Sequence, residues 1–151
     1  VAVQHPEATL QIVGDGPNRD LYESMIDDFG LRGRAEITGW CSQDEVRKAV
    51  HEASLFAFPS RHEGFGLALV EAMAAGCPVV ASDVGGIPEV VSEIPARLVP
   101  PEDPIALAEA IGASLDDPDW QEEAATASTR RASQFDWKRV TDAYERCLQR
   151  A

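Results

Sequence analysis

Residues 63–66 (EGFG) place a carboxylate and two glycines directly before an apolar segment that favours a helix. Glycine lets the backbone approach a ligand closely, and the first N–H groups of a helix have no carbonyl partner within it. The amides near Gly66 and Leu67 are therefore predicted to bind an anion, and phosphate is the natural occupant. Glycine-rich turns before helices are also common as purely structural features. Glu63 and His62, taken alone, are more typical of a solvated loop.

A second carboxylate, Glu71, stands eight positions after Glu63, inside the apolar run 67–75 (LALVEAMAA). A helix that is apolar on all faces is expected to be buried, and Glu71 falls one turn, about 5–6 Å, past the predicted anion site. A buried carboxylate needs a partner, because a desolvated ion is costly. Hydroxyl groups of a ligand and a salt bridge to an arginine such as Arg61 both satisfy that need, and the helix pattern leaves the two open.

These residues need a scaffold, and the chain alternates short apolar strands with helices. Strands are predicted at 9–13, 35–38, 55–58 and 79–82, with a short one at 98–99. Asn18 is predicted to cap a helix that Gly30 ends, Ser42 and Glu45 to form a capping box, and Gly76 to end the helix at 67–75. Helices at 105–115, 120–135 and 137–149 follow without a strand between them.

This alternation predicts an α/β fold, a doubly wound parallel sheet with extra C-terminal helices. The length suits a single domain, with an α/β core at 1–103 and helices at 104–151. Ligands of such sheets bind at the carboxyl ends of the strands. Two glycine-rich connections lie there, at 14–16 (GDG) after the first strand and at 63–66 after the third.

The composition limits the partners and surroundings. The net charge of −13 argues against nucleic acid or an anionic membrane as partner. Eleven arginines accompany only two lysines, which fits a halophile's surface and equally an ordinary acidic protein from an arginine-rich genome. Three cysteines without a CxxC pair favour a reducing cytosol, with Cys77 as a small core residue. The sequence contains neither a long apolar span nor a secretory signal.

Residues 61–82 (RHEGFGLALVEAMAAGCPVVAS) followed by 85–91 (GGIPEVV) closely resemble glycosyltransferase family 4, the retaining "glycosyl transferases group 1" enzymes with a GT-B fold. Two glutamates that flank seven residues mark that family. IVGDGP at 12–17, ITGW at 37–40 and FDW at 135–137 resemble family features in the expected order. The resemblance therefore covers nearly the whole chain.

The resemblance implies a role for each matching position. Glu63 would be the catalytic residue that bonds donor-sugar hydroxyls, and Glu71 would accept the ribose hydroxyls. The other implied contacts are amides of Phe65, Gly66 and Leu67 to the diphosphate, Gly14 and Gly16 along the cleft, the backbone of Thr38 and Gly39 at the base, and Arg61 as the nearest cation. The donor would be a UDP- or GDP-sugar, with no metal or other cofactor.

The chain also departs from the family pattern. GT-B enzymes have two Rossmann-like domains, and both the N-terminal acceptor domain and the first βα unit of the donor domain, with its Arg and Lys, are expected before Val1. The helix at 137–149 would cross onto that acceptor domain. Alone, this chain is expected to bind donor weakly and to transfer nothing. The resemblance thus implies a cytoplasmic transferase, with peripheral attachment to the inner membrane face through the missing domain left open.

Two other functions compete with this one. A stand-alone nucleotide-sugar-binding module without transfer activity would carry the same motifs. A flavodoxin-like regulatory domain is disfavoured, because no acidic cluster follows the first strand and Glu71 would have no role.

Overall fold

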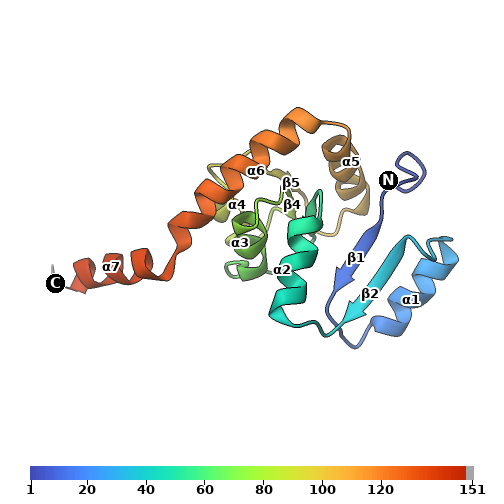
Figure 1. Cartoon of the computed structure of the whole chain (residues 1–151), viewed down its shortest axis with the longest axis horizontal. Helices are drawn as coiled ribbons and strands as arrows, with labels where there is room; N and C mark the ends of the chain where they lie inside the picture. The colour runs from blue at the N-terminus through green and yellow to red at the C-terminus, as the bar shows by residue number, and fades with distance from the viewer. Residues whose placement is uncertain (149–151) are drawn as a thin grey trace. The chain divides into compact units, whose positions relative to one another are not determined.

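The computed structural model describes residues 1–148 (Figure 1). The chain divides into two compact units, Val1–Ala49 and Val50–Ala151, and helix α2 (Gln43–Glu52) runs across the boundary in sequence. Each unit contains its own parallel sheet, so the hydrogen-bonded strands of the described residues form two sheets rather than one.

The first unit contains the parallel pair β1 (Leu10–Val13) and β2 (Ala35–Gly39), joined through helix α1 (Arg19–Asp28). The register pairs Ile12 with Ile37 and shifts directly after Ile12. Both strands lie where the sequence predicts them, and this βαβ connection is the one that alternating strands and helices favour.

The two predicted helix starts in the first unit have different outcomes. Ser42 and Glu45 form the predicted capping box: the Glu45 carboxylate accepts from the Ser42 amide at 2.7 Å, and the Ser42 hydroxyl accepts from the Glu45 amide at 3.3 Å. Hydrogen bonds from Ser42 also lower the pKa of Glu45. Asn18 does stand at the N-cap position of α1, as predicted, but its side chain makes no cap bond, and its φ of −99° and ψ of 12° are not the extended backbone of a typical capping residue.

The second unit contains a three-stranded parallel sheet in the order β3 (Phe56–Phe58), β4 (Val79–Ser82), β5 (Arg97–Val99). Helix α3 (Leu67–Ala74) connects the first two strands, and the short helix α4 (Ile87–Val90) connects the last two. All four residues of β4 are buried, as expected for a central strand of a parallel sheet covered on both faces.

Helices α5 (Pro104–Leu115) and α6 (Pro118–Ala132), the 3-10 turn η1 (Ser133–Phe135) and helix α7 (Trp137–Leu148) complete the second unit. The predicted helices at 105–115, 120–135 and 137–149 are found within a few residues of these bounds, and Gln149 lies outside the described residues. Aspartates cap α5 and α6 directly before a proline, a favourable helix start. Figure 1 shows α7 extending from the end of α6, away from the three-stranded sheet.

The hydrophobic core of the second unit lies between the sheet and helices α3, α4 and α6. Its fully buried members come from α3, β4 and α4: Leu69, Met73, Val79, Ala81, Ile87 and Val90. Cys77 is buried as predicted, and loss of solvation raises the pKa of its thiol to about 11.

Candidate functional site

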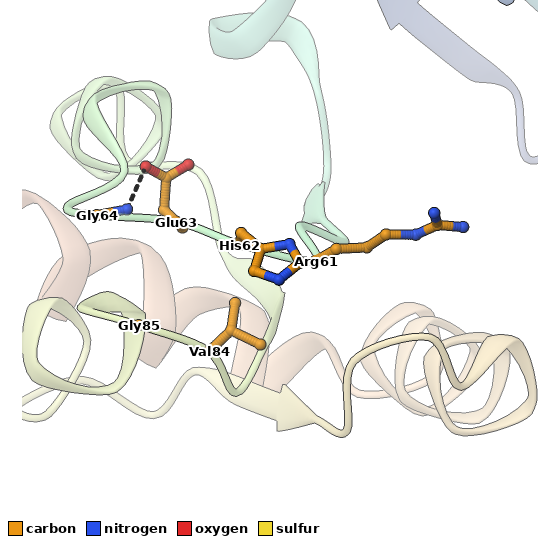
Figure 2. Close-up of a pocket in the computed structure, with 6 residues that line it drawn as sticks. All are labelled: Arg61, His62, Glu63, Gly64, Val84 and Gly85. Atoms are coloured by element: carbon orange, nitrogen blue, oxygen red, sulfur yellow. Dashed lines mark hydrogen bonds between the residues drawn. The ribbon is translucent and has the colours of Figure 1, made fainter.

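Glu63 lies in the loop between β3 and α3, at the carboxyl end of β3 (Figure 2). Its Oε1 atom accepts hydrogen bonds from the amides of Gly64 at 3.0 Å and Gly66 at 3.1 Å. The Glu63 side chain therefore folds back onto its own loop, and its carboxylate lies at the start of α3. Gly66 takes a φ of 87°, a left-handed conformation that favours glycine at this position.

The start of α3 has the free amides that the sequence predicts. The first hydrogen bond across the start of the helix runs from the Val70 amide to the Gly66 carbonyl at 3.1 Å. The amides of residues 67–69 precede it and have no carbonyl of the helix to bond. No described side chain accepts from these three amides, although Glu63 accepts from the Gly66 amide directly before them. The helix start can therefore donate to an anion, with its dipole favouring negative charge.

An open pocket of about 540 Å³ lies beside this loop (Figure 2). Its walls come from the segments that follow β3 and β4: Arg61, His62, Glu63, Gly64, Val84 and Gly85. The carboxyl ends of the two neighbouring parallel strands thus meet at the pocket, the edge at which α/β sheets bind ligands.

The expectation that Glu71 is buried is wrong. Glu71 is exposed, because α3 buries only the face that carries Leu69, Ala72 and Met73. The alternative salt bridge between Glu71 and Arg61 is absent from the described residues. Arg61 instead pairs with Glu102 at 3.0 Å, and both of these side chains are largely exposed.

Figure 2 shows the Arg61 side chain extending away from the Glu63 carboxylate. In this arrangement its guanidinium does not face the start of α3. His62 is exposed, as the sequence suggests. The residues that the structure does bring together here are Glu63, Phe65, Gly66 and Leu67.

The first unit brings the other predicted residues together in a cluster of their own. The Gly14 amide donates to the Gly39 carbonyl at 3.1 Å and lies 3.4 Å from the Thr38 hydroxyl. The Gly16 amide donates to the Asp15 carboxylate at 2.8 Å. The turn after β1 and the end of β2 therefore form one small polar surface, and Gly14 has a φ of 125° that requires glycine.

Arg19 also belongs to this cluster, although it lies outside the motifs that mark the other residues. Its guanidinium donates to the Ile37 carbonyl at 3.1 Å and pairs with Glu23 at 2.7 Å and Asp15 at 3.5 Å. The hydrogen bond to Glu23 is the main cause of its raised pKa. The spacing of four residues from Asp15 to Arg19 and on to Glu23 is the signal that could have revealed it.

Metal ions and membranes each require a particular arrangement of residues. In residues 1–148, no three His, Cys, Asp or Glu side chains are grouped so that they could hold a metal ion. In the same range, no helix has both the length and the apolar character needed to cross a membrane.

Known proteins resemble this chain in both sequence and structure. A family model described as "Glycosyl transferases group 1" matches residues 1–117. Glycogen synthase from Mycobacterium tuberculosis is 34% identical over 141 residues, which cover 92% of this chain and 34% of that protein. The lipopolysaccharide core biosynthesis glycosyltransferase LpsD from Rhizobium meliloti is 37% identical over 146 residues, which cover 95% of this chain and 42% of that protein.

Among solved structures, Anabaena HepE in complex with UDP and glucose matches with a TM-score of 0.85 and 28% identity, over 99% of this chain and 43% of that one. The chain thus spans less than half the length of these relatives. Its parallel α/β architecture is the Rossmann-like C-terminal half of a GT-B fold with added C-terminal helices. Since the family model covers most of the chain, this protein belongs to the glycosyl transferases group 1 family.

Proposed function

We propose that this chain is the donor-binding part of a retaining glycosyltransferase, which transfers a sugar from a nucleoside diphosphate to an acceptor hydroxyl. The observation that carries the proposal is the start of α3. There, the Glu63 carboxylate bonds the Gly66 amide directly before the free amides of α3, and Glu63 also lines an open pocket at the carboxyl ends of β3 and β4. A diphosphate supplies the negative charge that these amides attract.

This geometry supports the contacts that the family resemblance implies. The amides of Phe65, Gly66 and Leu67 bind the diphosphate, and Glu63 bonds hydroxyls of the donor sugar. Glu71 is exposed one turn along α3, so its carboxylate is accessible to the ribose hydroxyls. Because the Glu63 carboxylate accepts from the Gly66 amide in the free protein, donor binding exchanges that internal bond for one to phosphate.

Within the first unit, the polar cluster is proposed to contribute to nucleotide binding through the backbone of Gly14 and Gly16 and, at the base, through the backbone of Thr38 and Gly39. The UDP and glucose bound in Anabaena HepE support a UDP-sugar as one candidate donor. Arg61 would have to leave Glu102 before it could neutralise the diphosphate, so we assign that task to residues outside this chain.

In the proposed reaction, the bond between the anomeric carbon and the diphosphate oxygen breaks through an oxocarbenium-like state. The acceptor oxygen bonds to the anomeric carbon on the same face, and its proton passes to the departing diphosphate. The task of the protein is to stabilise the charge that grows on this leaving group. We propose that helix amides perform it without a metal, so that chelation with EDTA leaves nucleotide affinity unchanged.

The acceptor is proposed to bind to a second domain, which contacts α7. One face of α7 carries the exposed apolar side chains of Trp137, Val140, Tyr144 and Leu148. Their spacing of three, four and four residues places them on one stripe of the helix. Such a stripe is suited to packing against another folded domain.

Isothermal titration of the full chain with UDP, GDP and inorganic phosphate tests the donor site. We expect saturable binding of at least one nucleoside diphosphate, and weaker binding of phosphate alone. Absence of binding by a chain that circular dichroism shows to be folded would falsify the donor-site proposal. Binding together with absent transfer, even in a protein extended to the length of the relatives, would favour the stand-alone binding module.

A further inference from the structure

Gly85 and Gly86 pack directly against the backbone of the Glu63 loop. They form the connection between β4 and α4, and the sequence motif GGIPE begins with them. A methyl group added to Gly85 would overlap the carbonyl oxygen of Glu63 and lie 2.9 Å from its carbonyl carbon. One added to Gly86 would overlap the carbonyl oxygen of Gly64 and lie 3.4 Å from its carbonyl carbon. Real β-carbons essentially never approach other atoms within 3.0 Å.

The loop backbone that faces the glycine pair also holds the Glu63 carboxylate. The Glu63 carbonyl, which faces Gly85, shares its peptide with the Gly64 amide that donates to Oε1 of Glu63. The Gly64 carbonyl, which faces Gly86, shares its peptide with the Phe65 amide, and the Gly66 amide that also donates to Oε1 belongs to the next peptide. Displacement of either carbonyl therefore shifts the short backbone segment that carries both donors to Glu63.

The glycine pair has little freedom to move away from the loop. Ile87 and Val90 of α4 are buried in the core, and the Ile87 amide donates to the Val84 carbonyl at 3.1 Å. Arg131 of α6 donates to the carbonyls of Glu89 at 2.9 Å and Val90 at 3.0 Å, so the far end of α4 is also fixed.

The Glu63 loop is less tightly packed than the elements that flank the two glycines. Its residues 61–65 are exposed or half-buried, whereas β4 and α4, on the other side of the contact, carry half of the buried core residues. Because packed cores resist displacement, a side chain at position 85 or 86 moves the loop rather than the sheet.

We propose that Gly85 and Gly86 are positioning residues for the donor. Because they have no side chain, the Glu63 loop packs directly against them, in the position in which Glu63 and the α3 amides both face the nucleotide sugar. This inference rests on the proposed donor site. It adds that the GGIPE motif acts through the backbone of the neighbouring loop.

Of the alanine substitutions at positions 85 and 86, Gly86→Ala tests the proposal more specifically. Gly85 has a φ of 53°, so any side chain there adds backbone strain to the overlap. Gly86 has a φ of −84°, which alanine adopts freely. Gly86→Ala therefore introduces the overlap with the Gly64 carbonyl alone.

Gly76→Ala is the matched control. Gly76 follows α3 with a φ of 77°, so alanine strains the same unit without touching the loop. Both variants are expected to lower the thermal midpoint of the full chain. Only Gly86→Ala is expected to weaken UDP binding, by about tenfold or more, and to shift the amide signals of Gly64 and Gly66 in nuclear magnetic resonance spectra.

UDP affinity and the amide signals test the donor site and the positioning role separately. If the unmodified chain binds no nucleoside diphosphate, the donor site fails, while the Gly64 and Gly66 signals still test the positioning. If Gly86→Ala leaves those signals in place and UDP affinity within twofold of the unmodified chain, the positioning role is overturned. An equal loss of affinity in Gly76→Ala would also overturn it, since general destabilisation would then explain the effect.

Discussion

The ring of Phe135 meets the ring of Phe65 edge to face, with centroids 5.4 Å apart and an angle of 80° between the planes. Phe65 belongs to the loop before α3, and Phe135 ends the 3-10 turn after α6. The guanidinium of Arg131 lies 4.9 Å from the centroid of the Phe135 ring. Residues seventy positions apart in sequence thus form one aromatic contact beside the candidate site.

Phe135→Leu is expected to lower the free energy of unfolding by about 1 kcal/mol, because leucine keeps most of the apolar area and loses the edge-to-face pair. Urea denaturation followed by circular dichroism measures this change. Trp137→Leu is the control, since Trp137 is 80% exposed. Equal effects of the two substitutions would show that the aromatic pair contributes nothing specific.

Glu71→Ala is expected to weaken UDP binding by about 1–3 kcal/mol, because ribose hydroxyls would lose their acceptor. Inorganic pyrophosphate has no ribose, so its affinity should not fall. Because Glu71 is exposed, stability should stay within about 0.5 kcal/mol. Calorimetric titration of both ligands measures the effect, with the exposed Glu109 of α5 as the site of a control alanine. A parallel loss for pyrophosphate would contradict the assignment.

Glu63→Ala is expected to weaken binding of the sugar but not binding of the nucleotide. Removal of the carboxylate frees the Gly66 amide, so UDP should bind as tightly as before or more tightly. UDP-glucose should lose any advantage over UDP, because the acceptor for the sugar hydroxyls is gone. The ratio of the two affinities, by titration, is the measurement. Glu63→Gln serves as control, since its carbonyl oxygen can still accept both amides. Weaker UDP binding in Glu63→Ala would mean that the carboxylate organises the loop.

Burial of Cys77 should make stability depend on alkaline pH. The folded chain raises the pKa of this thiol to about 11 from a reference of 9.0. A raised pKa gives a contribution that is complete below pH 9 and is lost as the pH rises towards 11. Denaturant midpoints measured between pH 8 and about 11 should fall in the unmodified chain and fall less in Cys77→Ala. Parallel curves would contradict this origin.

The sequence predicts the elements of this fold well because their signals are local. Each signal determines the backbone of only a few residues around it. Examples are the VVAS run of β4, the Ser42–Glu45 capping box before α2 and Gly66 before α3. The short helix α4 was not predicted, since four residues that include a proline leave no periodic pattern.

The exposure of Glu71 could not be read from the apolar run around it. The burial of a helix face depends on what packs against it, and α3 packs only its Leu69–Met73 side within the described chain. The contact of Gly85 and Gly86 with the Glu63 loop was missed for a related reason. It joins two backbone segments about twenty residues apart in sequence, through atoms that every residue shares.

The internal hydrogen bond between Glu63 and the Gly66 amide also has a kinetic consequence. A phosphate can reach that amide only after the carboxylate has rotated away. Rotamer changes of accessible side chains take picoseconds to nanoseconds, far less than the time between encounters at micromolar concentrations. In stopped-flow measurements, the observed rate of nucleotide association should therefore rise linearly with concentration, without a plateau that would report a slow opening step.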